Sequence, residues 1–269
     1  SPSSAASDVY KRQDANSMCQ NVVVENCVGR SSASGLKFGT VSRGGFRNFK
    51  VKNIKIYDTY RSAITFAAVD GALIENIEVD GVRSIHTGNV IYLRIGDRWS
   101  AGKKPIMKNI TIKNVYAEIP MDKPDAGYNY EGPIEDLPRN ISPASIVGLP
   151  EYKIQNVTLQ NIEIVSPGGG NPYYAYRGLA PAELDSIPEM ATSYPEFSQF
   201  KELPAWGFYI RHAEGITFDN VTFKALKKDY RPAIVMDDAG KVTFKDVRFV
   251  EPESEGKKQI FPYKSKVIK

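Results

Sequence analysis

The stretches ITFDNVTF (residues 216–223) and VTFKDVRF (residues 242–249) share one pattern, and this pattern decides the fold. Apolar residues alternate with polar ones, and Asn or Asp stands at the fifth position. Alternation is typical of a β-strand with one buried face. Asn tolerates the left-handed backbone of a tight turn. Each stretch therefore predicts two short strands that meet at the Asn or Asp.

The pattern recurs along the chain as an internal repeat. Five earlier stretches carry it: VVVENCVG, FKVKNIKI, LIENIEV, ITIKNVYA and VTLQNIEI, of which the third keeps only the second half. The marked position falls at Asn26, Asn53, Asn76, Asn114, Asn161, Asn220 and Asp246. The short spacings between these residues define a unit of 23–27 residues, and the longer spacings are this unit with insertions. A strand-only repeat of this length is typical of a solenoid.

A further strand follows the marked pair in six of the repeats. Its sequences are SGLKFGT, SAITFAA, NVIYLRIG, ASIVGLP, GFYIRH and AIVMDD. Helical spacing is almost absent. The sequence therefore predicts an all-β protein, a right-handed parallel β-helix of about seven coils in which apolar residues of successive coils stack inside. Stacked turn Asn side chains can hydrogen-bond in a ladder.

The predicted domain covers residues 14–252, with insertions at 120–141 and 165–206. Residues 253–269 are expected to form a polar C-terminal tail. Residues 1–13 lack the repeat pattern, and Ser3–Gln13 can be back-translated into a widely used transposase sequencing adapter. We therefore expect residues 1–13 to be adapter-derived and non-native, and the β-helix to be truncated at its N-terminus.

Composition narrows the classes of partner. The net charge of +4 is too small to predict nucleic-acid binding. No apolar stretch is long enough to span a membrane. Cys19 and Cys27 are the two cysteines. Cys27 stands where other repeats have Val or Ile, so we expect it to be a buried free thiol. Two such cysteines define neither a metal site nor a disulfide framework, and we expect no cofactor and no metal.

The order of these pieces resembles glycoside hydrolase family 28, the polygalacturonase-like pectin hydrolases. The resemblance covers roughly residues 14–252 and is strongest at NVVVENCVGRSSASGLKFGTVSRGGFRNFKVKNIKIYD (residues 21–58). The stretches NVIYLRIGDR and NISPASIVGLPEYKIQNVTLQNIEI resemble the bacterial branch of the family. The resemblance implies a secreted or periplasmic glycosidase that cleaves galacturonan or rhamnogalacturonan by inverting hydrolysis of O-glycosidic bonds. We expect a monomer whose partner is a pectic polysaccharide or oligosaccharide.

The chain departs from the family at its catalytic motifs. The family has an Asn-Thr-Asp run, an Asp-Asp pair, a Gly-His-Gly and an Arg-Ile-Lys, and inverting hydrolysis needs one carboxylic acid and one carboxylate. The Asp runs would precede Asp14, where Asp14–Asn16 resembles a remnant of the preceding coil. Ser34 occupies the family His position, and TYRSAITF keeps Arg61 without the Lys. The resemblance thus implies that no catalytic residue is retained here and that the fragment itself is inactive.

Other carboxylates and histidines have simpler interpretations. Asp237–Asp238 is interpreted mainly as a turn between strands, and Glu135–Asp136 as solvated loop surface. His86 precedes a groove strand and is a weaker candidate for the groove. His212 is expected at the surface of a strand end.

The candidate substrate-binding residues follow from the alternation in NVIYLRIGDR. Ile91, Leu93 and Ile95 should point inward, so that Tyr92 and Arg94 point outward. The resulting candidates, with basic residues on the preceding coils, are Lys37, Arg61, Arg94, Asp97 and Arg98. A line of cations suits a polyanion, and Arg can grip carboxylates with two hydrogen bonds. Solvated surface charge is the alternative for each.

The insertion at 165–206 is rich in aromatic residues, and such long loops are usually functional. Its large aromatic residues are Tyr173, Tyr174, Tyr176, Tyr194, Phe197, Phe200 and Trp206. They can stack on sugar rings or anchor the loop to the body. The stretch PAELDSIPEM (residues 181–190) predicts one short helix.

Two other functions stay open. A pectate-lyase-like β-helix would need acidic calcium ligands on the groove strands, which the predicted strands do not offer. A non-catalytic carbohydrate-binding or adhesive β-helix is favoured somewhat by the missing His and Lys motifs.

Overall fold

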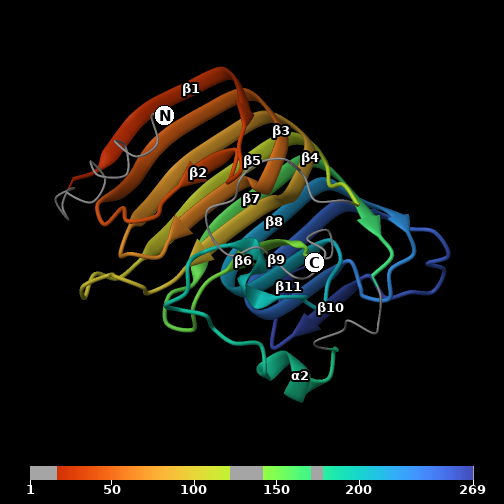
Figure 1. The fold of residues 1–269 in the computed structure, drawn as a ribbon. Helices are drawn as coiled ribbons and strands as arrows, with labels where there is room; N and C mark the ends of the chain where they lie inside the picture. The colour runs from red at the N-terminus through yellow and green to blue at the C-terminus, as the bar shows by residue number, and fades with distance from the viewer. Residues whose placement is uncertain (1–16, 122–141, 171–177, 269) are drawn as a thin grey trace.

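A computed structural model describes residues 17–121, 142–170 and 178–268, and these residues form an almost entirely β structure (Figure 1). The strands are β1 (Cys19–Arg30), β2 (Leu36–Phe38), β3 (Gly45–Ala68), β4 (Leu73–Ile95), β5 (Ile106–Glu118), β6 (Ala144–Val147), β7 (Ile154–Gly168), β8 (Phe208–Lys227), β9 (Ile234–Val250), β10 (Ile260–Tyr263) and β11 (Val267–Ile268). The helical elements are α2 (Pro181–Asp185) and the 3-10 helix η3 (Phe197–Phe200). The prediction of an all-β protein is confirmed.

The strands pair in parallel, and the long strands of successive repeats lie side by side. Hydrogen-bonded neighbours follow the order β1-β3-β4-β5-β7-β8-β9-β10, and Figure 1 shows them nested from β1 to β9. The long strand β3 pairs with β4 along its whole length, from Gly45 opposite Leu73 to Ala68 opposite Ile95. β6 pairs with both β4 and β8, so the pairings among β4, β5, β7, β8 and β6 close a ring of five parallel strands.

Each repeat bends at two positions that lie five residues apart. The residues there have positive φ, at 50–57° except for the two glycines. The first column contains Asn21, Asn48, Asn76, Asn109, Asn156, Gly215 and Lys241, and the second contains Asn26, Asn53, Gly81, Asn114, Asn161, Asn220 and Asp246. Asn and Gly dominate because they adopt this backbone at the lowest cost.

The Asn side chains of each column bond to one another across the repeats. In the first column, four successive amides donate to the preceding Oδ1 at 3.0–3.1 Å, from Asn48 to Asn156. In the second column, Asn161 donates to Asn114 at 3.1 Å and Asn220 donates to Asn161 at 2.9 Å. The expected Asn ladder is present, and it is double.

The structure corrects the alignment of the third repeat. The sequence template aligned Asn76 with Asn53, but the strand register places Asn76 in the first column and Gly81 next to Asn53. The template missed this position because Gly adopts positive φ without an Asn marker. Since Gly81 has no side chain to bond, Asn114 donates instead to Asp80 Oδ1 at 2.7 Å.

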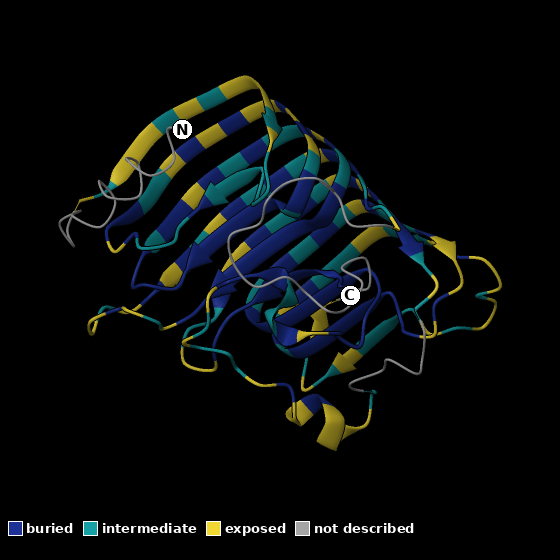
Figure 2. Ribbon diagram, in the orientation of Figure 1, coloured by how far each residue is buried: buried dark blue, intermediate teal, exposed yellow. Residues whose placement is uncertain are grey.

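The main core fills the inside of the stack, as the alternating buried and exposed bands in Figure 2 show. Ile91, Leu93 and Ile95 lie in this core as predicted. Cys27 corrects an expectation, because its thiol is exposed although it lies in register with buried Ile54. Its strand β1 pairs with β3 on one side only within the described residues, so no further strand covers Cys27.

The segment expected to be a polar C-terminal tail continues the stack. β10 pairs with β9 from Ile260 opposite Ile234, and β11 pairs with β9 at Val267 and Ile268. The parallel register thus extends beyond residue 252.

Substitution of Asn161 tests the double ladder. Asn161→Ala loses hydrogen bonds worth about 1 kcal/mol each and places Ala in a left-handed conformation that costs about 1–2 kcal/mol. Asn161→Gly also loses the hydrogen bonds, but Gly adopts the left-handed conformation without steric cost. We expect Asn161→Ala to lower the free energy of unfolding by about 1 kcal/mol more than Asn161→Gly, measured by urea denaturation. Equal losses in the two variants would contradict a role for the backbone bend.

Candidate functional site

The candidate site lies on the side of the stack that follows the two Asn bends. Here two rows of residues point away from the main core. The first row is Lys37, Thr65, Tyr92, Ser145, Tyr209, Val235 and Phe261, and the second is Ala67, Arg94, Val147, Arg211, Asp237 and Tyr263. We call this surface the outer face.

Residues 178–206 cover much of the outer face and build a second apolar core on it. This cluster contains Tyr92, Val147, Leu184, Ile187, Phe197, Phe200, Leu203, Ala205, Tyr209 and Val235. Helix α2 lies within the stretch where the sequence predicted it. Phe197 and Phe200 are buried in this second core and Trp206 in the main core, so these three aromatics anchor the insertion. Tyr194 remains 42% exposed.

Arg94 points outward as predicted, but the insertion buries it. Its side chain is 1% exposed, and its guanidinium donates to the carbonyl oxygens of Gly148 at 3.0 Å and Glu189 at 2.5 Å. An arginine that is covered and bonded in this way does not line an open groove. The prediction that Arg94 contacts substrate is therefore corrected, because residues 178–206 cover this side chain.

Three of the other predicted cations meet around one ring. The side chains of Lys37, Arg61 and Arg98 approach the Tyr194 ring, with their charged groups at 4.9, 5.6 and 5.4 Å from its centroid. Such cation–π contacts are worth about 0.5–1 kcal/mol at exposed sites. Lys37 belongs to β2, Arg61 to β3, and Arg98 follows β4, so three successive repeats contribute to this cluster.

The phenol of Tyr194 lies in a strongly positive surrounding. Partial burial raises its pKa, but the charge of Lys37, a hydrogen bond of 2.9 Å from Lys37 Nζ and the charge of Arg61 outweigh burial and lower the pKa overall. Because the Lys37 ammonium can only donate, the phenol oxygen accepts from it and keeps its own O–H available. Tyr194 thus offers a hydrogen-bond donor among cations.

Arg98 is held rigidly by Asp70. Its Nε and Nη2 donate to the two carboxylate oxygens of Asp70 at 3.0 and 2.7 Å. Asp70 is 1% exposed and also accepts from the backbone N–H of Val41 at 2.6 Å. Asp97, the acidic member of the predicted set, is exposed beside Arg98. Arg61 forms an ion pair with Glu196 of the insertion.

A second charged cluster lies at the C-terminal end of the outer face. His212 Nδ1 is 2.8 Å from Asp238 Oδ2, and His212 Nε2 is 3.1 Å from Glu189 Oε1. Arg211 pairs with Glu189 at 2.7 Å and with Asp237 at 3.1 Å. The backbone bends at Asp238, with φ of 48°, but Asp237 and Asp238 both lie within β9 and not in a turn between separate strands. His212 is buried rather than on the surface, because the insertion brings Glu189 over it.

The pKa values of the carboxyl groups in this cluster shift in opposite directions. Burial raises the pKa of Asp237 despite the charge of Arg211. Burial also opposes ionisation of Asp238, but hydrogen bonds from Lys153 and His212 outweigh it and lower its pKa. Glu189 behaves like Asp238, since His212 and Arg211 outweigh burial and lower its pKa.

Ser34 and His86 are the other candidates that the structure describes. Ser34 Oγ is 2.9 Å from Thr65 Oγ1. His86 Nδ1 bonds Asp58 Oδ1 at 2.8 Å at another bend of the stack. Asp14–Asn16 and Glu135–Asp136 lie outside the described residues, as do Tyr173, Tyr174 and Tyr176.

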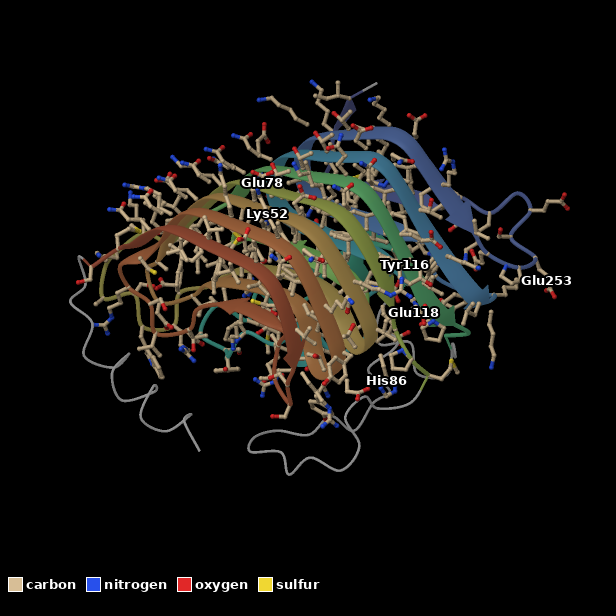
Figure 3. All side chains as sticks on the ribbon, turned by 90° about the horizontal axis from the view of Figure 1, so that it is seen from above. Lys52, Glu78, His86, Tyr116, Glu118 and Glu253 are labelled. Atoms are coloured by element: carbon tan, nitrogen blue, oxygen red, sulfur yellow. The ribbon has the colours of Figure 1, made fainter. Side chains whose placement is uncertain are left out.

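The surface along the second Asn column is polar, but its amide groups hydrogen-bond to one another. A shallow hollow of about 410 Å³ follows Asn114, Asn161 and Asn220, whose amides bond to one another. Tyr116 lies beside Glu118 (Figure 3) and donates to it at 2.6 Å. Within the described ranges, no group of three His, Cys, Asp or Glu side chains is placed to hold a metal ion. None of the described helices has the length and apolar character needed to span a membrane.

The sequence analysis did not identify Asp70 and Tyr194 as the residues that hold the cation cluster together. Asp70 stands in an Asp-Gly pair that is typical of a turn, and nothing local indicates that it binds Arg98. Tyr194 was one aromatic among seven, and its contact with Lys37 spans 157 positions of the chain.

Comparisons of the chain with protein-family models, with curated proteins and with solved structures give no match.

The neighbouring residues Asp237 and Asp238 provide a matched test of the charged cluster. At neutral pH we expect Asp238→Asn to lower the free energy of unfolding by about 1 kcal/mol, because charge-assisted hydrogen bonds are lost at a partly exposed site. Asp237→Asn should raise it, because the environment disfavours that carboxylate. Urea denaturation between pH 2 and 8 measures both.

The pH dependence of the two variants follows from the pKa directions. The stabilisation that ionised Asp238 adds to the free energy of unfolding is present above the ordinary Asp pKa of about 3.9. It is lost as the pH falls through the lowered pKa of Asp238. Ionised Asp237 lowers the free energy of unfolding at pH values above its raised pKa. This destabilisation disappears as the pH falls below about 3.9. Both differences from the wild type should therefore vanish in acid. Destabilisation of the same sign in both variants at pH 7 would contradict the assignment.

Proposed function

We propose that the chain forms a right-handed parallel β-helix that binds an acidic pectic polysaccharide on its outer face. The β-helix is supported by the parallel pairing of successive repeats and by their double Asn column. Right-handedness is supported by the strong general preference of parallel crossover connections.

The observation that carries the binding function is the cluster of Lys37, Arg61 and Arg98 around Tyr194. A galacturonan has a carboxylate on each sugar, and cations on successive repeats match a repeating anion. Arg61 and Arg98 are already paired with carboxylates of the chain. Within the described residues, Lys37 has the Tyr194 hydroxyl as its partner and forms no ion pair with a carboxylate. Lys37 is therefore the cation best placed to receive a ligand carboxylate.

Hydrolysis is the part of the proposal that rests on resemblance to polygalacturonase-like enzymes. Such inverting enzymes place an acid and a base about 6.5–9.5 Å apart across the bond that breaks. We assign neither role to a residue of this chain. The second candidate, a carbohydrate-binding β-helix without hydrolysis, is favoured by Ser34, which bonds Thr65 at the position of the family His.

Replacement of Lys37 tests the binding function. Lys37→Gln keeps a hydrogen-bond donor on a side chain one atom shorter but removes the charge. We expect about tenfold weaker binding of oligogalacturonate, which corresponds to about 1.4 kcal/mol, and little change for a neutral oligosaccharide, both measured by calorimetry. Higher salt should weaken the binding of the wild type, because charge pairs at the surface are screened.

Lys228→Gln serves as the matched control, since Lys228 is exposed and its recorded ion pair is with Glu253. It should bind oligogalacturonate as the wild type does. Equal effects of the two variants, or equal losses for acidic and neutral ligands, would argue against the proposal. Release of new reducing ends from polygalacturonan or rhamnogalacturonan separates a hydrolase from a binding protein.

A further inference from the structure

Trp99 is an exposed indole directly beside the cation cluster. Its side chain is 54% exposed, although its neighbour Ser100 is buried. It follows β4 in the short segment that also supplies Asp97 and Arg98. An exposed Trp is the most costly apolar side chain to leave in water, and such residues often mark binding surfaces.

The ring of Trp99 is held in place. The Arg98 guanidinium lies 3.8 Å from the ring centroid and so covers one face of the indole. Arg98 is itself fixed by two hydrogen bonds to buried Asp70. The Trp99 carbonyl oxygen accepts from Arg43 Nε at 3.2 Å, which restrains the backbone. Since one face is covered and more than half of the side chain is exposed, the other face is open to solvent.

A second exposed ring lies near the same guanidinium. Tyr194 is 42% exposed, and its centroid is 5.4 Å from Arg98 Cζ. Arg98 thus stands between two rings that come from distant parts of the chain. One ring has an open face, and the other offers a hydroxyl group.

We infer that Trp99 is a stacking subsite for a pyranose ring of a bound saccharide, with Arg98 as its rigid support. This inference rests on the proposed saccharide binding and adds the residue that recognises the ring itself. The C–H groups on one face of a pyranose form a flat apolar surface that fits an indole. The positive charge of Arg98 beneath the ring leaves the open face for apolar contact, while the hydroxyls and carboxylates of the sugar reach Lys37 and Tyr194.

The preorganisation of this platform lowers the entropic cost of binding. A ring that is fixed before the ligand arrives loses little rotamer freedom when the complex forms. Contact with a sugar ring is independent of the charge of the sugar. Trp99 should therefore contribute to neutral and acidic oligosaccharides alike, in contrast to Lys37.

Intrinsic fluorescence offers a direct test, because the chain has two tryptophans and Trp206 is 3% exposed. Titration with trigalacturonate and with a neutral trisaccharide should change the emission of Trp99 and protect it from acrylamide. In Trp99→Phe, which keeps Trp206, the emission change should disappear. Trp99→Ala should bind both ligands about tenfold more weakly by calorimetry. Tyr57→Phe, which alters an exposed aromatic on β3, should bind like the wild type.

The outcomes separate this inference from the proposed function. Weaker binding of both ligands by Trp99→Ala, with selective loss of the acidic one by Lys37→Gln, supports both. Binding by the wild type that Trp99→Ala leaves unchanged overturns the stacking subsite alone. Equal losses for the acidic and the neutral ligand in Lys37→Gln overturn the acidic preference alone. Absence of saccharide binding by the wild type overturns both. Trp99 emission that changes with protein concentration and not with saccharide overturns the stacking subsite alone, because it would indicate a second copy of the chain as the occupant.

Discussion

The pair of left-handed bends in each repeat is the constraint on which the structure depends. A residue with φ near 55° turns the chain without breaking the parallel pairing on either side, so one long strand supplies several faces of the stack. The Asn side chains then bond along the stack at the same bends. Because both ladders fix the register locally, the length of chain between repeats can vary. The second-column spacing from Asn161 to Asn220 is more than twice the spacing from Asn26 to Asn53, yet both pairs hydrogen-bond in the same way.

The longest spacing, from Asn161 to Asn220, has a structural consequence, since residues 178–206 of the extra chain pack on the outer face. Residues 178–206 bury one part of this face and leave another part open. In the buried part, Arg94 and Arg211 bond backbone carbonyls and Glu189 of the insertion. In the open part, Trp99 is exposed beside Arg98, and Lys37 is partly exposed beside Tyr194. Whether a cation of the outer face can meet a ligand is thus decided by where the insertion lies.

The repeat pattern was sufficient to predict the all-β class, the parallel stacking and the inward positions in β4. It succeeded because alternation and turn residues are local signals that many repeats confirm together. It misplaced Asn76 because Gly81 has the required backbone without the side chain that marks it. It also predicted burial for Cys27, since alternation shows which way a side chain points and not whether another strand covers it. The covering of Arg94, the burial of His212 and the pairing of Arg98 with Asp70 all depend on contacts between distant segments, for which a single sequence has no signal.

The insertion does not merely close the outer face, because it also completes the candidate site. Tyr194 comes from the insertion, whereas the three cations around it come from the stack. The position of Tyr194 is fixed by its neighbours in the chain, since Phe197 and Phe200 are buried in the second core and Glu196 pairs with Arg61. The same contacts that bury Arg94 therefore hold the phenol near Lys37. A shorter insertion would expose more cations, but it would lose the ring around which they gather. The composition of the open part, with cations, a phenol and an indole in fixed positions, follows from this division between stack and insertion.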